Sequence, residues 1–148
     1  NASRLLNGEN RIIFRQGDLL QPFSDVAFDL IVSNPPYISA AEYAILAREI
    51  RAYEPKAALW AGVEGLDIYQ RLIAEAPSYL KPGGYVLVEI GYGQKDTVVG
   101  IFQKHGFAIK EVIKDYAGIE RVVVAQGRGN YQDLGEAGIK IPAYPKSW

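Results

Sequence analysis

A run of consecutive apolar residues that stops at two prolines places the strongest constraint on the fold of this chain. Residues 30–32 are Leu, Ile and Val, and the tetrapeptide Asn34-Pro35-Pro36-Tyr37 follows almost at once. A short apolar run without alternation is typical of a parallel strand that is covered on both faces. Proline lacks the backbone N–H that a strand ladder needs, so this strand has to end before the tetrapeptide.

Strand-like and helix-like patterns alternate along the rest of the chain. We expect the end of a helix at 2–7, strands at 11–15, 28–33, 85–90, 107–114 and 121–126, helices at 40–51, 66–80 and 94–105, and a loop at 81–84. Ser39 and Glu42 have capping-box spacing, and Gly106 is suited to end the last helix. Helices join the earlier strands, which should be parallel, whereas the link before residue 121 is too short for a crossover. These patterns predict a three-layer α/β/α fold that finishes in an antiparallel hairpin.

Composition removes several classes of function. The chain has 16 basic and 17 acidic residues, a net charge of −1, which gives no broad attraction to nucleic acid or anionic lipid. It has no cysteine and one histidine, so we expect no disulfide, no cysteine nucleophile and no metal site. No apolar stretch approaches the roughly 20 residues that span a bilayer, and we expect a soluble, cytoplasmic protein. The chain starts at Asn1 and has no methionine, so we interpret it as a piece of a longer protein.

The tetrapeptide is the segment with the most distinctive chemistry. In open α/β sheets, ligands bind outside the carboxyl ends of strands. The Asn34 side-chain carbonyl and the Pro35 backbone carbonyl can each accept one hydrogen from a planar NH₂ group, and Tyr37 offers a flat face. Fixed acceptors of this kind could orient a weakly nucleophilic amide nitrogen for attack on a sulfonium methyl group. An Asn-Pro pair alone favours a simple turn, whereas the whole tetrapeptide after a buried strand favours a binding site.

Several segments together resemble the HemK/PrmC family of protein-(glutamine-N5) methyltransferases. The resemblance rests on the tetrapeptide, Glu54-Pro55 with Ala58-Leu59, Gly65-Leu66 with Tyr69, Leu80-Lys81-Pro82-Gly83-Gly84, Glu89-Ile90-Gly91 with Gln94, and Asp115-Tyr116 with Gly118 and residues 121–125. It implies a Rossmann-like fold that uses S-adenosyl-L-methionine, with residues 1–126 as a partial catalytic domain and 127–148 as a C-terminal tail. It also implies a partner that is the substrate, a peptide chain release factor methylated in its Gly-Gly-Gln motif.

The same resemblance implies roles for five residues. Asn34 would be the catalytic residue, and Asn34, Pro35, Pro36 and Tyr37 would bind the glutamine amide. Asn34 would also lie near the methyl group of the cofactor, and Asp18 near its adenine end. The family's glycine-rich cofactor turn and ribose-binding acid have no counterpart in this sequence. We therefore expect the C-terminal portion of the catalytic domain, truncated at its N-terminus, with weak or no binding of cofactor.

Other interpretations stay open at this point. The tetrapeptide also occurs in enzymes that methylate amino groups of adenine or cytosine in nucleic acid. A truncated α/β module could instead be inactive and self-associate through exposed sheet edges. Asp18 could simply cap a loop, and Arg121 could simply form an ion pair.

Overall fold

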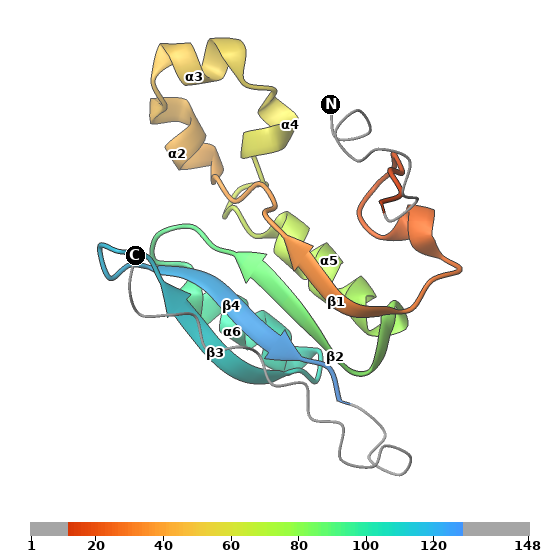
Figure 1. Ribbon diagram of the computed structural model, residues 1–148. Helices are drawn as coiled ribbons and strands as arrows, with labels where there is room; N and C mark the ends of the chain where they lie inside the picture. The colour runs from red at the N-terminus through yellow and green to blue at the C-terminus, as the bar shows by residue number, and fades with distance from the viewer. Residues whose placement is uncertain (1–11, 129–148) are drawn as a thin grey trace.

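The computed structural model describes residues 12–128 as a mixed sheet with helices (Figure 1). The elements are η1 (Gln21–Phe23), β1 (Phe28–Ser33), α2 (Ala40–Ile45), α3 (Arg48–Tyr53), α4 (Lys56–Leu59), α5 (Asp67–Glu75), η2 (Ala76–Ser78), β2 (Leu80–Glu89), α6 (Lys95–Lys104), β3 (Ala108–Lys114) and β4 (Glu120–Gln126). The helix end predicted at 2–7 and the tail beyond Arg128 lie outside the described residues. No helix within residues 12–128 is long and apolar enough to cross a membrane.

The four strands lie in the order β1-β2-β4-β3. β1 is parallel to β2, while β4 is antiparallel to both of its neighbours, β2 and β3. β1, β2 and β3 therefore all run in one direction, and β4 is inserted between the last two against that direction. The sequence predicted both the parallel pair and the terminal antiparallel hairpin, and both are confirmed. The result is a Rossmann-like α/β fold.

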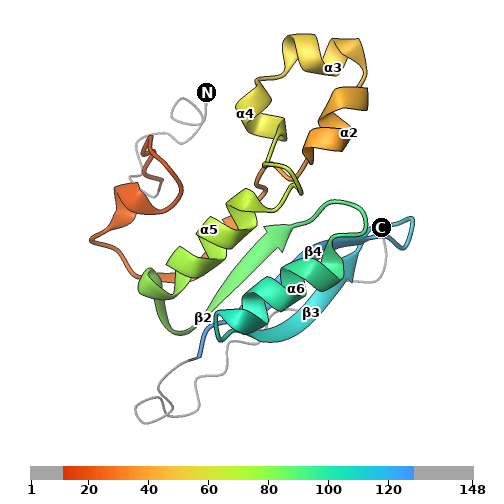
Figure 2. The same ribbon diagram turned by 180° about the vertical axis from the view of Figure 1, so that it is seen from behind.

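The core lies between one face of this sheet and the helices α5 and α6, which Figure 2 shows on the same side. Ile31, Val86 and Ala125 are register partners across β1, β2 and β4. They belong to one buried cluster with Ile73 of α5 and Phe102 of α6. Burying a side chain of this kind stabilises the fold by roughly 1.5–3 kcal/mol. Both helices connect parallel strands in the same direction across the sheet, so right-handed crossovers place them on the same face.

The opposite face of the sheet is covered by no helix of residues 12–128. Leu30 and Val32 are 50% and 67% exposed, whereas Ile31 between them is 7% exposed. Side chains alternate along a strand, so Leu30 and Val32 project away from α5 and α6. Of the three layers predicted, the described residues form two, because both of their sheet-covering helices follow crossovers of the same sense. Self-association through the exposed edge stays a prediction.

Residues 12–15 do not form the strand that was predicted over 11–15. The sheet begins at β1, and no strand within residues 12–128 lies beyond it. A strand needs a hydrogen-bonded neighbour, so the β propensity of an apolar triplet is insufficient here. Ile12, Ile13 and Phe14 are accordingly exposed. The segment is instead tied to the loop before β1, where Arg15 forms an ion pair of 3.1 Å with Asp25.

The helix predicted over 40–51 is broken into α2 and α3. Leu46 and Ala47 have extended backbone, with ψ of 145° and 141°, which interrupts the helical hydrogen bonds. The predicted capping box is confirmed, because Ser39 N donates to Glu42 Oε2 at 2.9 Å and Glu42 N donates to Ser39 Oγ at 3.2 Å. The helix therefore starts where its cap predicts, and ends early.

Residues 39–60 form a lobe that contains α2, α3 and α4 and stands beyond the carboxyl end of β1 (Figure 1). A parallel bridge between Ile38 and Trp60 closes its base. Lys56 joins α4 to α2, because its ammonium group lies 4.7 Å from the Trp60 ring and 5.7 Å from the Tyr43 ring. None of the three helices has a buried residue, so these contacts and the bridge hold the lobe together.

The loop predicted at 81–84 lies within β2. The register moves from the pair Phe28 and Leu80 to the pair Leu30 and Tyr85, so residues 81–84 form an irregularity that β1 does not match. Gly83 has φ of +74°, a conformation that a side chain disfavours. Gly83 thus has a backbone conformation that is typical of a turn, but residues 81–84 form a bulge in β2 and do not interrupt the strand.

Candidate functional site

The tetrapeptide leaves the sheet at the carboxyl end of β1. Asn34 is exposed, Pro35 is buried, and Pro36 and Tyr37 are partly buried. The pairing of Ser33 with Val88 of β2 fixes the start of the segment, and the two prolines then fix φ at successive positions. The Asn34 amide is therefore held at the rim of the molecule, on a stiff backbone, and outside the core.

The other end of the tetrapeptide is packed against the backbone of two glycines. A Cβ atom on Gly91 would lie 2.9 Å from Tyr37 Cδ2, which is too close for that ring to stay in place. A Cβ atom on Gly65 would clash with the carbonyl oxygen of Tyr37, and Gly65 also has φ of +75°. Gln94 Nε2 donates to the same carbonyl oxygen at 3.0 Å. From sequence, Gly65, Gly91 and Gln94 contribute only to the family resemblance, and no local pattern predicts their contact with Tyr37.

A cavity of about 450 Å³ opens beside Tyr37, between α2 and the turn after β2. Its lining includes apolar side chains from the lobe and polar ones from the sheet side, among them Tyr37, Ile45, Leu46, Glu42, Gln94 and Arg121. Asn34, Pro35 and Pro36 are not among the lining residues, so only the last member of the tetrapeptide reaches this cavity. Its size falls in the range of ligand-binding pockets. A smaller cavity of about 240 Å³ lies beside Leu80 at the start of β2, at the other end of the sheet.

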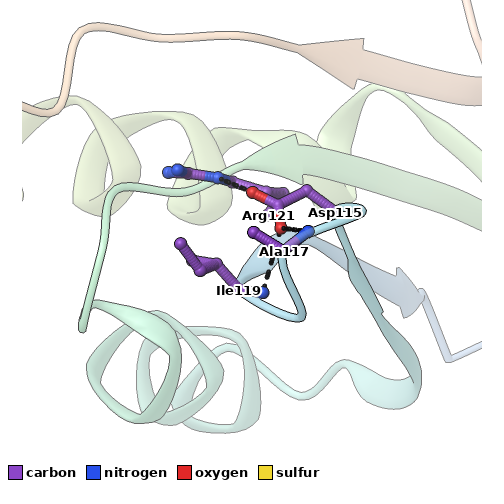
Figure 3. A network of polar contacts seen from close by, with 4 residues as sticks. All are labelled: Asp115, Ala117, Ile119 and Arg121. Atoms are coloured by element: carbon purple, nitrogen blue, oxygen red, sulfur yellow. Dashed lines mark hydrogen bonds and ion pairs between the residues drawn. The ribbon is translucent and has the colours of Figure 1, made fainter.

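Arg121, at the wall of the larger cavity, is held by a carboxylate in the turn between β3 and β4 (Figure 3). Asp115 accepts from Ala117 N at 2.9 Å, from Ile119 N at 3.0 Å and from Arg121 Nε at 2.9 Å. These hydrogen bonds, that of Ile119 above all, hold the pKa of Asp115 below its usual range. The ion pair that sequence analysis suggested for Arg121 is confirmed, and it leaves the outer guanidinium nitrogens directed away from Asp115 (Figure 3).

Tyr69 of α5 connects the core to the site. The side chain is 0% exposed, and its hydroxyl donates to Glu89 O at 2.9 Å and to Gln94 Oε1 at 3.4 Å. Burial raises the pKa of Tyr69 well above its usual value, so the hydroxyl stays neutral and remains a donor. Sequence periodicity placed Tyr69 on the inward face of its helix, which is confirmed.

Asp18 lies in the loop that precedes η1 and forms an ion pair with Arg71 of α5. Both side chains are about half exposed. The pair fixes this loop against α5, the helix that packs on the core side of the sheet, and Arg71 of that helix holds the Asp18 carboxylate in place. The predicted contact of Asp18 with the adenine end of a cofactor stays a prediction.

Comparison with known proteins gives several relatives that carry the name release factor glutamine methyltransferase. No family model matches the chain. It is 49% identical over 113 residues to the release factor glutamine methyltransferase of Geobacter sulfurreducens, which is 76% of this chain and 40% of that protein. It is 41% identical over 124 residues to the enzyme of the same name from Thermodesulfovibrio yellowstonii, which is 84% of this chain and 44% of that protein.

Solved structures give weaker similarity. The protein-(glutamine-N5) methyltransferase (release factor-specific) of Alicyclobacillus acidocaldarius is 27% identical with a TM-score of 0.38, over 62% of this chain and 61% of that one. A methyltransferase from Pyrococcus furiosus is 19% identical with a TM-score of 0.47, over 70% of this chain and 42% of that one. The fold assignment therefore depends on the strand order described above.

The chain spans about two fifths of the length of the curated relatives that it matches. Within that span the identity of 41–49% is in keeping with the resemblance noted from sequence. By sequence, this chain belongs to the release factor glutamine methyltransferase family.

Proposed function

We propose that this chain acts in a methyltransferase that transfers a methyl group from S-adenosyl-L-methionine to the side-chain amide nitrogen of glutamine in the Gly-Gly-Gln motif of peptide chain release factors. One observation carries the proposal: the tetrapeptide of a family member stands at the carboxyl end of a parallel strand with Asn34 exposed on a stiff backbone. That is where ligands of open α/β sheets bind.

Two acceptors on a fixed backbone orient the substrate amide. The side-chain carbonyl of Asn34 accepts one N–H of the planar NH₂ group, and the backbone carbonyl of Pro35 accepts the other. Pro36 keeps the Pro35 carbonyl in one direction, and the Tyr37 ring packs against the flat face of the amide. The amide lone pair is delocalised, so alignment and stabilisation of the developing positive charge lower the barrier. The proton that the nitrogen loses leaves to solvent at the exposed rim.

S-adenosyl-L-methionine, when bound, supplies an electrophilic methyl group on a positively charged sulfur. Residues 12–128 provide two groups whose chemistry fits its ends. Arg71 pairs with Oδ2 of Asp18, and Oδ1 can accept from the exocyclic amino group of adenine. The Asn34 amide oxygen would lie near the methyl group. Asp18 and Asn34 would then hold the cofactor at its two ends.

The alternative substrate, an amino group of adenine or cytosine in nucleic acid, is less well supported. Enzymes that extract a base from a duplex need a positively charged groove. The chain has a net charge of −1, and two relatives that are 49% and 41% identical carry the release factor name. A protein substrate is the assignment that these observations support.

The direct test is transfer of labelled methyl groups. The gene product that contains this chain is incubated with labelled S-adenosyl-L-methionine and either a release factor or DNA. Label should enter the release factor, and a Gln→Ala change in its Gly-Gly-Gln motif should abolish the transfer. Label that enters only DNA would refute the glutamine assignment.

The role of Asn34 is tested by its alanine variant. Asn34→Ala should lower kcat/KM about 100-fold or more, since fixed polar groups at the reacting centre have effects of this size. The free energy of unfolding should change by less than about 0.5 kcal/mol, because the side chain is exposed. Gln70→Ala, an exposed amide on α5, is the matched control and should change neither quantity. Equal losses of activity and stability in Asn34→Ala would contradict the proposed role.

A further inference from the structure

Gln94 lies immediately before α6, yet its side chain makes no capping hydrogen bond to that helix. Its Oε1 accepts from Gly91 N at 2.9 Å and from the Tyr69 hydroxyl at 3.4 Å. Its Nε2 donates to Tyr37 O at 3.0 Å and to Gly65 O at 3.5 Å. One partly buried amide thus joins the tetrapeptide, the approach to α5, α5 itself and the turn after β2.

The backbone around this amide is shaped to admit it. A Cβ atom on Gly91 would lie 2.7 Å from Gln94 Oε1, and one on Gly65 would lie 3.1 Å from Gln94 Nε2. Neither position therefore has room for a side chain while the amide stays where it is. The amide orientation is also fixed chemically, because Gly91 N can only donate and so faces Oε1, while the carbonyls of Tyr37 and Gly65 can only accept and so face Nε2.

The consequence falls on the tetrapeptide. Its first end is fixed by the β1 ladder, through the pairing of Ser33 with Val88. Its last carbonyl, that of Tyr37, is fixed by Gln94. Between these two anchors, Pro35 and Pro36 allow little rotation about φ. The carbonyl groups of Asn34 and Pro35 thus have one direction available to them only while the Tyr37 carbonyl is held.

We infer that Gln94 is a positioning residue for methyl transfer, which holds the tetrapeptide through the Tyr37 carbonyl so that its two acceptors meet the substrate amide in one orientation. The expected loss of methyl transfer rests on the proposed function. The expected release of the tetrapeptide rests on the geometry alone. Misplacement of reacting groups by about 1 Å can cost on the order of 100-fold in rate.

Two substitutions separate positioning from bulk. Gln94→Glu keeps the size and both acceptor contacts of Oε1 but replaces the donor with a carboxylate oxygen that faces two carbonyls. Gln94→Met keeps the length and removes all hydrogen bonds. Gln103→Glu, an exposed position on the same helix, is the matched control for the added charge. At neutral pH we expect kcat to fall at least tenfold in both Gln94 variants, and to be unchanged in Gln103→Glu.

The pH profile gives a readout that a merely structural role would not move. A protonated carboxyl donates as the amide does, so the kcat of Gln94→Glu relative to wild type should rise as pH falls toward the carboxyl pKa. The relative kcat of Gln94→Met should stay flat. A flat ratio for Gln94→Glu as well, or a kcat equal to wild type at neutral pH, would overturn the inference.

Hydrogen exchange tests the geometry without any activity. Deuterium uptake of the peptide that covers residues 33–40 should be faster in Gln94→Glu and Gln94→Met than in wild type, and unchanged in Gln103→Glu. Unchanged uptake in both Gln94 variants would refute the inference even if wild-type enzyme methylates a release factor. A wild-type protein that transfers no methyl group would refute the proposed function. Faster deuterium uptake in the Gln94 variants would still support the conclusion that Gln94 holds the tetrapeptide.

Discussion

Removal of the buried Tyr69 hydroxyl should destabilise the fold at neutral pH by an amount that disappears in alkali. In Tyr69→Phe the ring stays in its fully buried position, and the donor to Glu89 O at 2.9 Å and to Gln94 Oε1 at 3.4 Å is lost. A hydrogen bond contributes about 1 kcal/mol net, and a partly buried carbonyl left without its donor adds to that. We therefore expect the free energy of unfolding to fall by about 1–2 kcal/mol at neutral pH.

The sign of the pH dependence follows from proton linkage. Burial raises the pKa of Tyr69 in the folded state above the ordinary value near 10 that it has in the unfolded chain. Above that pH the unfolded state loses a proton that the folded state keeps, so the stability of the wild type falls by about 1.4 kcal/mol per pH unit. Phenylalanine has no proton to lose, and the other tyrosines are common to both proteins. The advantage of the wild type should vanish roughly one unit above pH 10.

Urea unfolding followed by far-ultraviolet circular dichroism measures both effects. Wild type and Tyr69→Phe are compared at about pH 7.5, 9.5 and 11, with the stability difference taken from midpoints at a common m-value. Tyr116→Phe is the control, because Tyr116 is 99% exposed and should give no difference at any pH. A difference between wild type and Tyr69→Phe that stays constant from neutral to alkaline pH would refute the reasoning.

Three further substitutions test the backbone around the site, all by urea unfolding. Gly100→Ala should stabilise the protein by about 0.5–1 kcal/mol, since this helical position has no atom within 4 Å of an added Cβ. Gly91→Ala should destabilise it by about 1–3 kcal/mol, since the added Cβ would lie 2.9 Å from Tyr37 Cδ2; a stabilised variant would contradict this packing. Ser39→Ala should cost about 1 kcal/mol at neutral pH. Hydrogen bonds from Ser39 lower the pKa of Glu42, so this cost should shrink below about pH 4 and would be constant if the capping box were absent.

The elements that sequence predicted correctly are those whose cause is local. β1 ends where its prolines begin, α2 starts at its capping box, and Gly106 follows α6 with φ of +83°. The strand predicted over 11–15 is wrong for residues 12–15, because a strand depends on a hydrogen-bonded neighbour that no local pattern reveals. The break between α2 and α3 is similar, since it lies in the lobe that the bridge between residues 38 and 60 closes, and that contact between distant residues is not visible in a local pattern.

The candidate site divides along the same line. The place of the tetrapeptide followed from a general rule about strand ends, and its exposed Asn34 agrees with that rule. Gln94 holds it by a hydrogen bond and Tyr69 contacts Gln94, and both residues lie far along the chain and come near the tetrapeptide only through the sheet order β1-β2. One signal was available: a glutamine three residues after Gly91, at a helix start where a shorter polar residue is the preferred cap.

That mismatch between residue and position carries a general consequence for this chain. A glutamine is a poor N-cap, so its presence at the start of α6 weakens that helix end. Hydrogen bonds of its amide to other segments can compensate by stabilising the fold elsewhere. Here the amide bonds to the tetrapeptide, and the start of α6 has no hydrogen bond from the side chain of residue 94. Gln94→Ser should release the Tyr37 carbonyl without gaining a helix cap, because residue 94 has helical φ and ψ of −87° and −5° and a capping serine needs an extended backbone. Stability and hydrogen-exchange protection of residues 33–40 should then both fall, whereas a glutamine that served α6 alone would leave the protection of residues 33–40 unchanged.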